Sequence, residues 1–341
     1  MVKLRRSKLN PILTPSKKNW WEKEAVFNPG VCQKDGRVFL LYRAIGEYEF
    51  YVSRLGLAWS DDGFRFRRVN REPILEPTKL YDRWGCEDPR ITSFSDGRFF
   101  ITYTALSEPA NNGGGPPATA LLSTKDFKNF RRYGIVTPFG SDNRDVVLFP
   151  EKIKRKYIML HRPHRWTQRE VLRMFNQKKS DIAESEIWVP STLGNLPEKP
   201  SIWIGQSRNL RKWSGYEVVM EPREDCQWEA MKIGAGVPPI KTEKGWLLIY
   251  HGVDNQKVYR VGAALLDLKD PSKVVARLPY PILEPEESYE KEGDVPNVVF
   301  PTGAIIRDGI LFVYYGAADK VIGLATIEMD LLLEELKQYL E

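Results

Sequence analysis

The chain has 341 residues, of which 42% are hydrophobic and 28% charged, and its 51 basic and 45 acidic residues give a net charge of +6. This composition is that of a folded globular protein, and it excludes long disorder, collagen and coiled coil. The positive charge favours anionic ligands, but it is spread too evenly along the chain to indicate nucleic acid.

The cysteines, histidines and N-terminus are typical of a cytoplasmic protein without a bound metal. Cys32, Cys86 and Cys226 are too few and too far apart for a disulfide framework or a paired metal site. The histidines His161, His164 and His251 lack the further ligands that a metal site needs. The basic N-terminus is followed by no apolar signal stretch, and no run approaches the roughly 20 apolar residues of a membrane helix.

One strand phrase recurs five times along the chain. Each copy joins turn residues to an aromatic and β-branched run, which is typical of a strand opened by a hairpin. The copies read DGRVFLLYRA at 35–44, DGRFFITYTA at 96–105, KRKYIMLHRP at 154–163, EKGWLLIYHG at 243–252 and RDGILFVYYG at 307–316. A proline-bearing strand precedes each copy, with Pro29, Pro89, Pro150, Pro238 and Pro301, and a third strand follows it. Repetition at this period predicts an all-β chain folded as one five-bladed β-propeller over residues 1–341.

Three segments depart from the repeat. An insertion at about 164–200, between the third and fourth units, includes a short predicted helix, WTQREVLRMFNQ. The glycine- and proline-rich loop at 108–118 cannot join a strand ladder, so we expect a connection near the binding face. The C-terminal EMDLLLEELKQYL is apolar at helical spacing and predicts a packing helix.

Polar residues stand at matching positions of the repeats, where the innermost strands of a propeller line a central funnel. Just before the repeat prolines lie Asn28, Asp88, Arg144, Lys232 and Asp294, and after them come Arg43, Tyr103 with Thr104, Arg162, His251 and Tyr315. Internal salt bridges between blades are the structural alternative for any one of them. Together, two arginines, a lysine and a histidine suit a phosphate group, and a carboxylate facing them suits a general acid.

Longer motifs resemble one enzyme family over essentially the whole chain. They include CEDPRIT at 86–92, RDVVLFPEKIKRKYIMLHRP at 144–163, MKIGAGVPPI at 231–240, YHGV at 250–253, VGAALLDL at 261–268 and EGDVPNVVFPTGAI at 292–305. On these strings the chain resembles glycoside hydrolase family 130, the β-mannoside phosphorylases and related hydrolases. The resemblance implies an inverting phosphorylase that cleaves a β-mannosidic bond with inorganic phosphate and gives α-mannose 1-phosphate.

The resemblance also implies roles for particular residues. Asp88 matches the family's general acid, which protonates the leaving oxygen through the 3-hydroxyl of the mannose in the −1 subsite. Arg144, Arg162 and Lys232 match phosphate-binding positions, His251 and Tyr259 match accessory phosphate contacts, and Asn28, Arg43 and Asp294 match positions that hold the −1 mannose. The partners implied are an oligosaccharide and phosphate as a co-substrate, with no cofactor, nucleic acid or membrane; surface insertions and the C-terminal helix are available for a homo-oligomer interface.

Several alternatives stay open at this stage. An inverting β-mannosidase would use water and need a second carboxylate as base, whereas a non-catalytic sugar-binding propeller would have no use for the three cations. Glu87 rivals Asp88 as acid, although neighbouring strand residues point to opposite faces. Arg43 could pair with Asp294 instead of substrate. We favour a β-1,4 linkage, and Tyr81, Trp84 and Trp166 are candidates for contact with the acceptor sugar.

Overall fold

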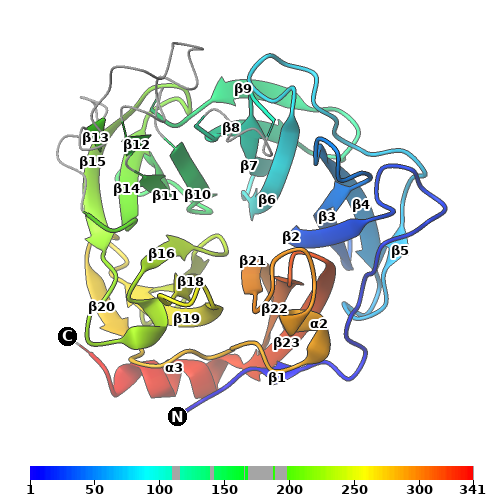
Figure 1. Cartoon of the computed structure of the whole chain (residues 1–341). Helices are drawn as coiled ribbons and strands as arrows, with labels where there is room; N and C mark the ends of the chain where they lie inside the picture. Colours follow the sequence, from blue (N-terminus) through cyan, green and yellow to red (C-terminus); the bar gives the residue numbers. More distant parts are fainter. Residues whose placement is uncertain (110–115, 139–141, 165, 168–186, 189–197, 341) are drawn as a thin grey trace.

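The computed structural model describes residues 1–109, 116–138, 142–164, 166–167, 187–188 and 198–340. In this part of the chain the regular structure is mainly antiparallel β-sheet, which confirms the all-β class. Figure 1 shows the sheets set around a common centre, with β2, β6, β10, β16 and β21 as the strands nearest to it. The insertion helix expected within 164–200, most of the loop insertion at that place and residues 110–115 of the loop at 108–118 lie outside the described residues.

The strands fall into groups of hydrogen-bonded neighbours, and within each group the first strand lies nearest the centre and the later ones further out. The first two groups are β2 (Ala25–Lys34), β3 (Arg37–Ile45), β4 (Ser53–Ser60) and β5 (Arg67–Arg68), then β6 (Gly85–Ser93), β7 (Phe99–Leu106), β8 (Ala118–Thr124) and β9 (Arg131–Ile135). One parallel residue pair, Ser53 with Gly85, joins these two groups into a single sheet. The third group is β10 (Asp142–Leu148), β11 (Tyr157–His164), β14 (Ile202–Ser207) and β15 (Trp213–Met220).

The remaining groups complete the ring. The fourth holds β16 (Lys232–Ala235), β17 (Ile240–Lys241), β18 (Trp246–Val253), β19 (Tyr259–Leu266) and β20 (Val274–Arg277), and the last holds β21 (Val299–Arg307), β22 (Ile310–Ala317), β23 (Val321–Glu328) and β1 (Arg5–Arg6). The short strands β12 (Trp166–Thr167) and β13 (Ile187–Trp188) pair with each other. Each recurrent phrase contributes a strand of an antiparallel hairpin, as the sequence predicts.

The two ends of the chain meet in the last sheet. Strand β1 pairs antiparallel with β23, so the N-terminal segment supplies the outermost strand of a sheet made otherwise from C-terminal residues. The C-terminal helix is confirmed as α3 (Met329–Lys337), whose Met329, Leu332 and Leu336 are buried in a core cluster with Val2 and Leu4. The other described helices are the single turns η3 (Gln227–Glu229) and α2 (Ser288–Lys291), and no described helix has the length and apolar character needed to cross a membrane.

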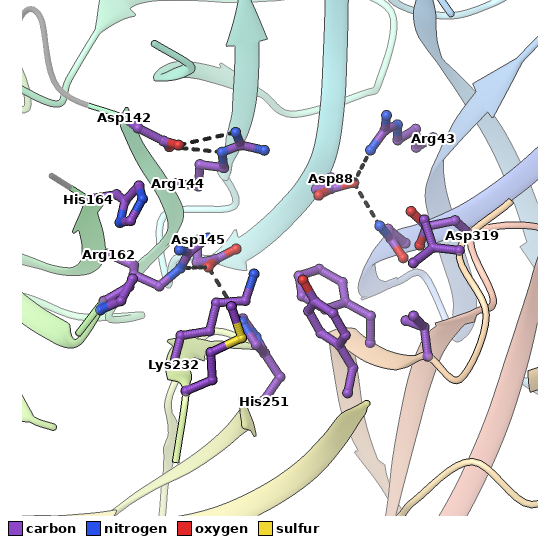
Figure 2. Close-up of a pocket in the computed structure, with 17 residues that line it drawn as sticks. Arg43, Asp88, Asp142, Arg144, Asp145, Arg162, His164, Lys232, His251 and Asp319 are labelled. Carbon is purple, nitrogen blue, oxygen red and sulfur yellow. Dashed lines mark hydrogen bonds and ion pairs between the residues drawn. The ribbon is translucent and has the colours of Figure 1, made fainter. Parts of the chain in front are cut away.

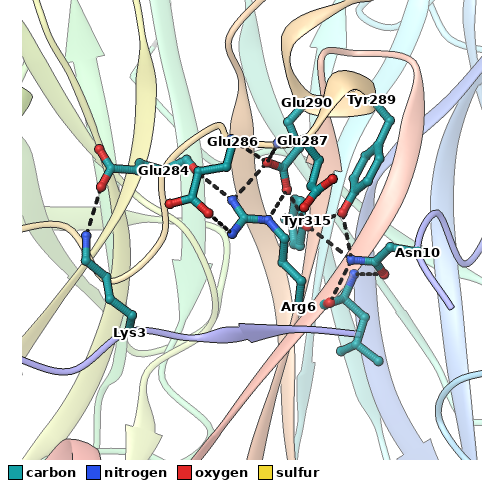
Figure 3. Close-up of polar contacts among 10 residues, drawn as sticks. Lys3, Arg6, Asn10, Glu284, Glu286, Glu287, Tyr289, Glu290 and Tyr315 are labelled. Atoms are coloured by element: carbon teal, nitrogen blue, oxygen red, sulfur yellow. Dashed lines mark hydrogen bonds and ion pairs between the residues drawn. The ribbon is translucent and has the colours of Figure 1, made fainter. Parts of the chain in front are cut away.

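A buried tyrosine, a carboxylate and an arginine form a repeated triad away from the centre. In the last sheet the Tyr315 hydroxyl donates to Glu290 at 2.7 Å, and Arg6 Nε donates to the same carboxylate at 2.9 Å (Figure 3). The equivalent triads elsewhere are Tyr42, Glu22 and Arg68; Tyr103, Asp82 and Arg132; and Tyr250, Glu229 and Arg277. All four carboxylates have no exposed surface. Because each is hydrogen-bonded and ion-paired, the triads tie the outer strand of a sheet to its interior.

Candidate active site

A cavity of about 380 Å³ opens where the innermost strands converge (Figure 2). Its walls carry many charged side chains, which is unusual for a fold whose strands are otherwise apolar. The residues that line it are Asn28, Arg43, Asp88, Asp142, Arg144, Asp145, Arg162, His164, Pro200, Met231, Lys232, His251, Tyr259, Val295, Val298, Phe300 and Asp319. Every residue given a role by the family resemblance is in this set except Asp294, whereas Tyr103, Thr104 and Tyr315, also expected in the funnel, do not line the cavity.

Three of these side chains are directed into the cavity by the same backbone feature, a bulge that contains a residue with positive φ. Asn28, Asp88 and Asp145 have positive φ values of 47°, 47° and 56°, each within a register shift of an innermost strand. Asparagine and aspartate tolerate this left-handed conformation better than most residues. A bulge re-aims a side chain that would otherwise follow the strict alternation of a strand, and bulges are common next to active sites.

On one wall, Asp88 is held by two hydrogen-bond donors. Asn28 Nδ2 lies 2.8 Å and Arg43 Nη1 lies 3.1 Å from Asp88 Oδ1. The Asn28 Oδ1 atom is buried and has no hydrogen-bond partner among the described residues. A Cβ atom at position 316 would lie 1.8 Å from Asn28 Oδ1, so only glycine at that position leaves room for the Asn28 side chain. The wall therefore offers a ligand a fixed carboxylate, with the amide of Asn28 held beside it.

Arg43 does not pair with Asp294, which excludes the structural alternative considered for it. Its other terminal nitrogen, Nη2, donates to Glu87 at 2.5 Å, and Glu87 also accepts from the Ser53 hydroxyl at 3.0 Å. Burial raises the pKa of Glu87, while the charge of Arg43 opposes the rise. Glu87 is 4% exposed and, unlike Asp88, does not line the cavity. Of the two rival carboxylates, Asp88 is the one that a ligand can reach.

Asp294 lies beside the cavity rather than in its wall. Its carboxylate accepts from the Tyr48 hydroxyl at 3.0 Å, the Tyr51 hydroxyl at 3.1 Å and Lys320 Nζ at 3.2 Å. The carboxylate that lines the cavity from this side is Asp319, in the turn between β22 and β23. Burial raises the pKa of Asp319 to about 7, helped by the negative charges of nearby carboxylates and opposed by Arg43.

The opposite wall carries the three predicted phosphate cations (Figure 2). Arg144 donates from Nε and Nη2 to Asp142 at 2.8 and 3.2 Å, and Arg162 Nε donates to Asp145 at 2.5 Å. Lys232 has neither a hydrogen bond nor an ion pair with any described residue; its Nζ lies 5.0 Å from the ring centre of Tyr259. Burial, reinforced by the charge of Arg162, lowers the pKa of Lys232 to about 8. A half-buried ammonium without a counter-ion is suited to an anionic ligand.

His251 and Tyr259 complete this wall. The His251 ring lies 5.9 Å from that of Tyr259 and 4.6 Å from that of Phe300, and its Nε2 is 3.7 Å from Asp145 Oδ2. Burial lowers the pKa of His251 to about 3, so the ring is neutral. Its Nδ1 is buried without a partner among the described residues. A Cβ at position 234 would stand 2.4 Å from Asp145 Oδ2, so Gly234 is what lets the aspartate and histidine approach.

Three carboxylates of the cavity, Asp142, Asp145 and Asp319, are not predicted from the sequence. The repeat pattern matches Arg144 to Asn28 and Asp88, but the structural equivalent of those two residues is Asp145. The alignment rested on the repeat prolines, and Pro150 comes later after the bulge than Pro29 and Pro89 do after theirs. The available signal was the residue type, since an Asn or Asp opens the bulge in all three strands.

The aromatic residues considered for acceptor contact do not line the cavity in the described structure. Tyr81 packs against a core cluster, and the Trp84 ring lies 5.6 Å from the ring of Phe50. The side chain of Trp166 lies outside what is described. Tyr48 and Tyr51, whose rings stack 6.1 Å apart, bind Asp294 beside the cavity.

This arrangement defines a sugar-processing site: one wall offers a carboxylate and hydroxyl-binding groups, and the other offers an anion site. The family model described as "beta-1,4-mannooligosaccharide phosphorylase" matches residues 3–180 and 195–338. The chain therefore belongs to glycoside hydrolase family 130, as its motifs indicate.

Similar proteins of known structure or activity cover nearly the whole chain. A 1,2-beta-oligomannan phosphorylase from Thermoanaerobacter sp. (strain X514) is 40% identical over 96% of this chain and 98% of that protein. A beta-1,4-mannooligosaccharide phosphorylase from Ruminococcus albus is 32% identical over 84% of this chain and 76% of that protein. The structure of a beta-1,2-mannobiose phosphorylase from Listeria innocua, in complex with beta-1,2-mannobiose, superposes with a TM-score of 0.80 at 29% identity, covering 98% and 99% of the two chains.

Proposed function

We propose that this protein is an inverting β-mannoside phosphorylase. It uses inorganic phosphate to cleave a β-mannosidic bond at the non-reducing end of an oligosaccharide and releases α-D-mannose 1-phosphate and a shortened saccharide. The observation that carries this proposal is the cluster of Arg144, Arg162 and Lys232 on the wall opposite Asp88, with Lys232 lacking a counter-ion among the described residues.

The wall opposite Asp88 is suited to a phosphate nucleophile. Beyond the nitrogens bonded to Asp142 and Asp145, Arg144 keeps Nη1 and Arg162 keeps Nη1 and Nη2 without a hydrogen bond to a described residue. Guanidinium groups match two phosphate oxygens at once, and an ammonium adds a compact charge. Phosphate is already anionic, so it attacks C1 of the mannose without a general base, while the cations hold it against the developing oxocarbenium centre.

Asn28, Arg43, Asp88 and Asp319 hold the mannose in this proposal. The amide of Asn28 contacts a sugar hydroxyl, and Asp319 adds a carboxylate from the cavity wall. Asp294, beside the cavity, keeps the mannose-binding role that the family resemblance implies for it. As C1 bonds to a phosphate oxygen, the glycosidic bond breaks and its oxygen receives the proton of Asp88 through the mannose 3-hydroxyl, as the family resemblance implies. Attack from the wall opposite the acid inverts the anomeric carbon.

An inverting hydrolase is less well supported. It would need a carboxylate free to deprotonate water. Burial acts to raise the pKa of Asp145, but the positive charges of Arg162 and Arg90 outweigh it and hold that pKa below its usual range. Asp142 is engaged by Arg144 through two hydrogen bonds. The carboxylates nearest the anion site are therefore poor bases.

The β-1,4 linkage favoured from the sequence is not confirmed. The Thermoanaerobacter and Listeria relatives are named for β-1,2-linked mannosides, whereas the family model and the Ruminococcus relative are named for β-1,4-linked ones. Because the relative at 40% identity is among the former, we take β-1,2-linked oligomannosides as the substrate and β-1,4-linked ones as the alternative. We further take the chain to be a single five-bladed propeller, a description that the grouping of its strands supports.

A linkage panel tests the proposal. Initial rates are measured on β-1,2-mannobiose, β-1,2-mannotriose, β-1,4-mannobiose and mannosyl-β-1,4-glucose, each with and without phosphate. We expect phosphate-dependent release of mannose 1-phosphate, fastest from the β-1,2-linked substrates. A higher kcat/KM on the β-1,4 substrates would overturn the linkage, and equal rates without phosphate would overturn the phosphorylase.

A further inference from the structure

A carboxylate stands inside the anion site, where a site built for negative charge alone would have none. Asp145 lines the cavity together with Arg162, Lys232 and His251. Its Oδ1 accepts from Arg90 Nη2 at 2.9 Å and its Oδ2 accepts from Arg162 Nε at 2.5 Å. The residue is only 3% exposed, so both oxygens are fixed in place.

We propose that Asp145 makes this site selective for phosphate over sulfate by accepting a hydrogen bond from the P–OH group of the bound anion. This inference rests on the proposed function. Near neutral pH, inorganic phosphate keeps at least one O–H group, whereas sulfate has none. An ionised carboxylate is an acceptor only, so it binds an anion that can donate a proton and repels one that cannot.

The charges of the anion site, on the wall opposite Asp88, do not separate the two anions by themselves. Arg144, Arg162 and Lys232 on this wall and Arg90 behind it supply four positive charges against the two negative charges of Asp142 and Asp145, which leaves this wall a net charge of +2. That balance suits any tetrahedral dianion, sulfate included. Selectivity therefore needs a group that distinguishes an anion with an O–H group from one without. A buried hydrogen-bond acceptor does so, because it binds a ligand that lacks the matching O–H group much more weakly.

Asp145 meets the requirements for such an acceptor. Each carboxylate oxygen can accept about two hydrogen bonds, and each oxygen of Asp145 accepts one from an arginine among the described residues. Oδ2 also faces His251 Nε2 at 3.7 Å across the space that Gly234 leaves open. The neighbouring arginines keep the side chain ionised, so it does not itself donate a proton to an anion.

The first test uses the wild-type protein. Phosphorolysis is measured at fixed phosphate with rising sulfate or rising arsenate, which has the size and shape of phosphate and keeps an O–H group. We expect arsenate to compete at concentrations near the KM for phosphate and sulfate to have no effect at concentrations 100-fold higher. Sulfate inhibition near the KM for phosphate would overturn the inference. A rate that does not depend on phosphate would instead overturn the proposed function.

The second test compares two variants that change the charge of the cavity equally. In Asp145→Asn the amide can turn its N–H towards a sulfate oxygen, so we expect sulfate to become a competitive inhibitor with an inhibition constant at least tenfold lower than in wild type. Asp142→Asn removes a charge from the same cavity and should still exclude sulfate. A gain of sulfate binding in Asp142→Asn alone, or equally in both, would overturn the assignment to Asp145. If Asp145→Asn does not fold, the wild-type comparison decides.

Discussion

The triads and the cavity contain charged groups of the same residue types. The two sets differ in how far their hydrogen-bond and ion-pair partners are present among the described residues. In the triad around Glu229, the carboxylate accepts from Tyr250 at 2.7 Å and pairs with Arg277 at 2.9 Å and Arg223 at 2.5 Å. In the cavity, Lys232 has no such partner among the described residues, and Asn28 Oδ1 and His251 Nδ1 lack hydrogen bonds. Buried atoms without a hydrogen bond also occur outside the cavity, Arg277 Nη2 among them, but a half-buried ammonium in a cavity wall without a counter-ion indicates a site for an anionic ligand.

The difference teaches that burial of charge does not by itself mark an active site. Arg6 and Arg277 are as much part of internal ion pairs as Arg144 and Arg162 are, yet they serve stability. What separates the two sets is the unused donor or acceptor capacity that points into a cavity. The following predictions test this separation, beginning with the largest effect.

Removing the acid should abolish turnover without unfolding the protein. Asp88→Asn keeps the side chain's size and can still accept from Arg43, so we expect the melting temperature to stay within a few degrees. We expect kcat to fall by about 10²–10⁴-fold, the range typical of general acid catalysis. The checks are steady-state kinetics and thermal unfolding; a variant that keeps a tenth of wild-type turnover would rule out Asp88 as the acid.

Breaking a triad should lower the free energy of unfolding without changing the binding of phosphate. Glu229→Gln leaves Arg223 and Arg277 without their counter-ion in a buried position, which costs about 3–5 kcal/mol of unfolding free energy. The KM for phosphate should stay unchanged at a temperature where the variant is folded. Urea unfolding measures the loss, with Glu151→Gln as the control because its exposed pair with Lys241 contributes less than about 1 kcal/mol. Equal losses in both variants would contradict the account of the triads.

Truncating Lys232, the unpaired lysine, should weaken the binding of phosphate and leave the binding of the mannoside nearly unchanged. Lys232→Ala removes a charge-assisted contact worth about 1.5–3 kcal/mol, so we expect the KM for phosphate to rise about 10- to 100-fold. The KM for the mannoside should change less than about twofold. Lys241→Ala is the control, since this exposed lysine pairs with Glu151 far from the cavity lining. Equal changes in both KM values for Lys232→Ala would remove it from the phosphate site.

The smallest effect is a pH dependence of phosphate binding. The pKa of Lys232 is about 8 instead of its usual 10.5, so the side chain is charged below pH 8 and loses its proton as the pH rises through that value. We expect the KM for phosphate to be constant up to about pH 7.5 and to rise above pH 8. Lys232→Arg, which stays charged, should remove the rise. A wild-type KM that is flat to pH 9.5 would contradict this role.

Much of the fold could be predicted because each repeat is recognisable from its strand periodicity and its turn residues. Arg43, Arg162 and His251 were predicted as site residues because they occupy the same place on regular hairpin strands. Asp145 was missed because a bulge shifts the register by a residue that no periodic pattern records. Asp319 was missed because it belongs to a turn, whose position over the cavity depends on tertiary packing.

The contacts of Asp294 could not be predicted for a similar reason. It stands in an irregular segment before β21, where neither strand alternation nor helical spacing fixes the direction of a side chain. The structure places it against Tyr48, Tyr51 and Lys320, which come from two other loops. Contacts between loops depend on the whole fold, so local sequence patterns predict them poorly.

The most direct test of the account is the stoichiometry of the reaction, followed by phosphorus-31 NMR together with an assay for free mannose. The protein is incubated with β-1,2-mannobiose in phosphate buffer and, separately, in a phosphate-free buffer. The account predicts one α-mannose 1-phosphate for each bond cleaved and no cleavage without phosphate. Free mannose formed at the same rate in both buffers would contradict the central claim that the cations of the cavity bind the nucleophile.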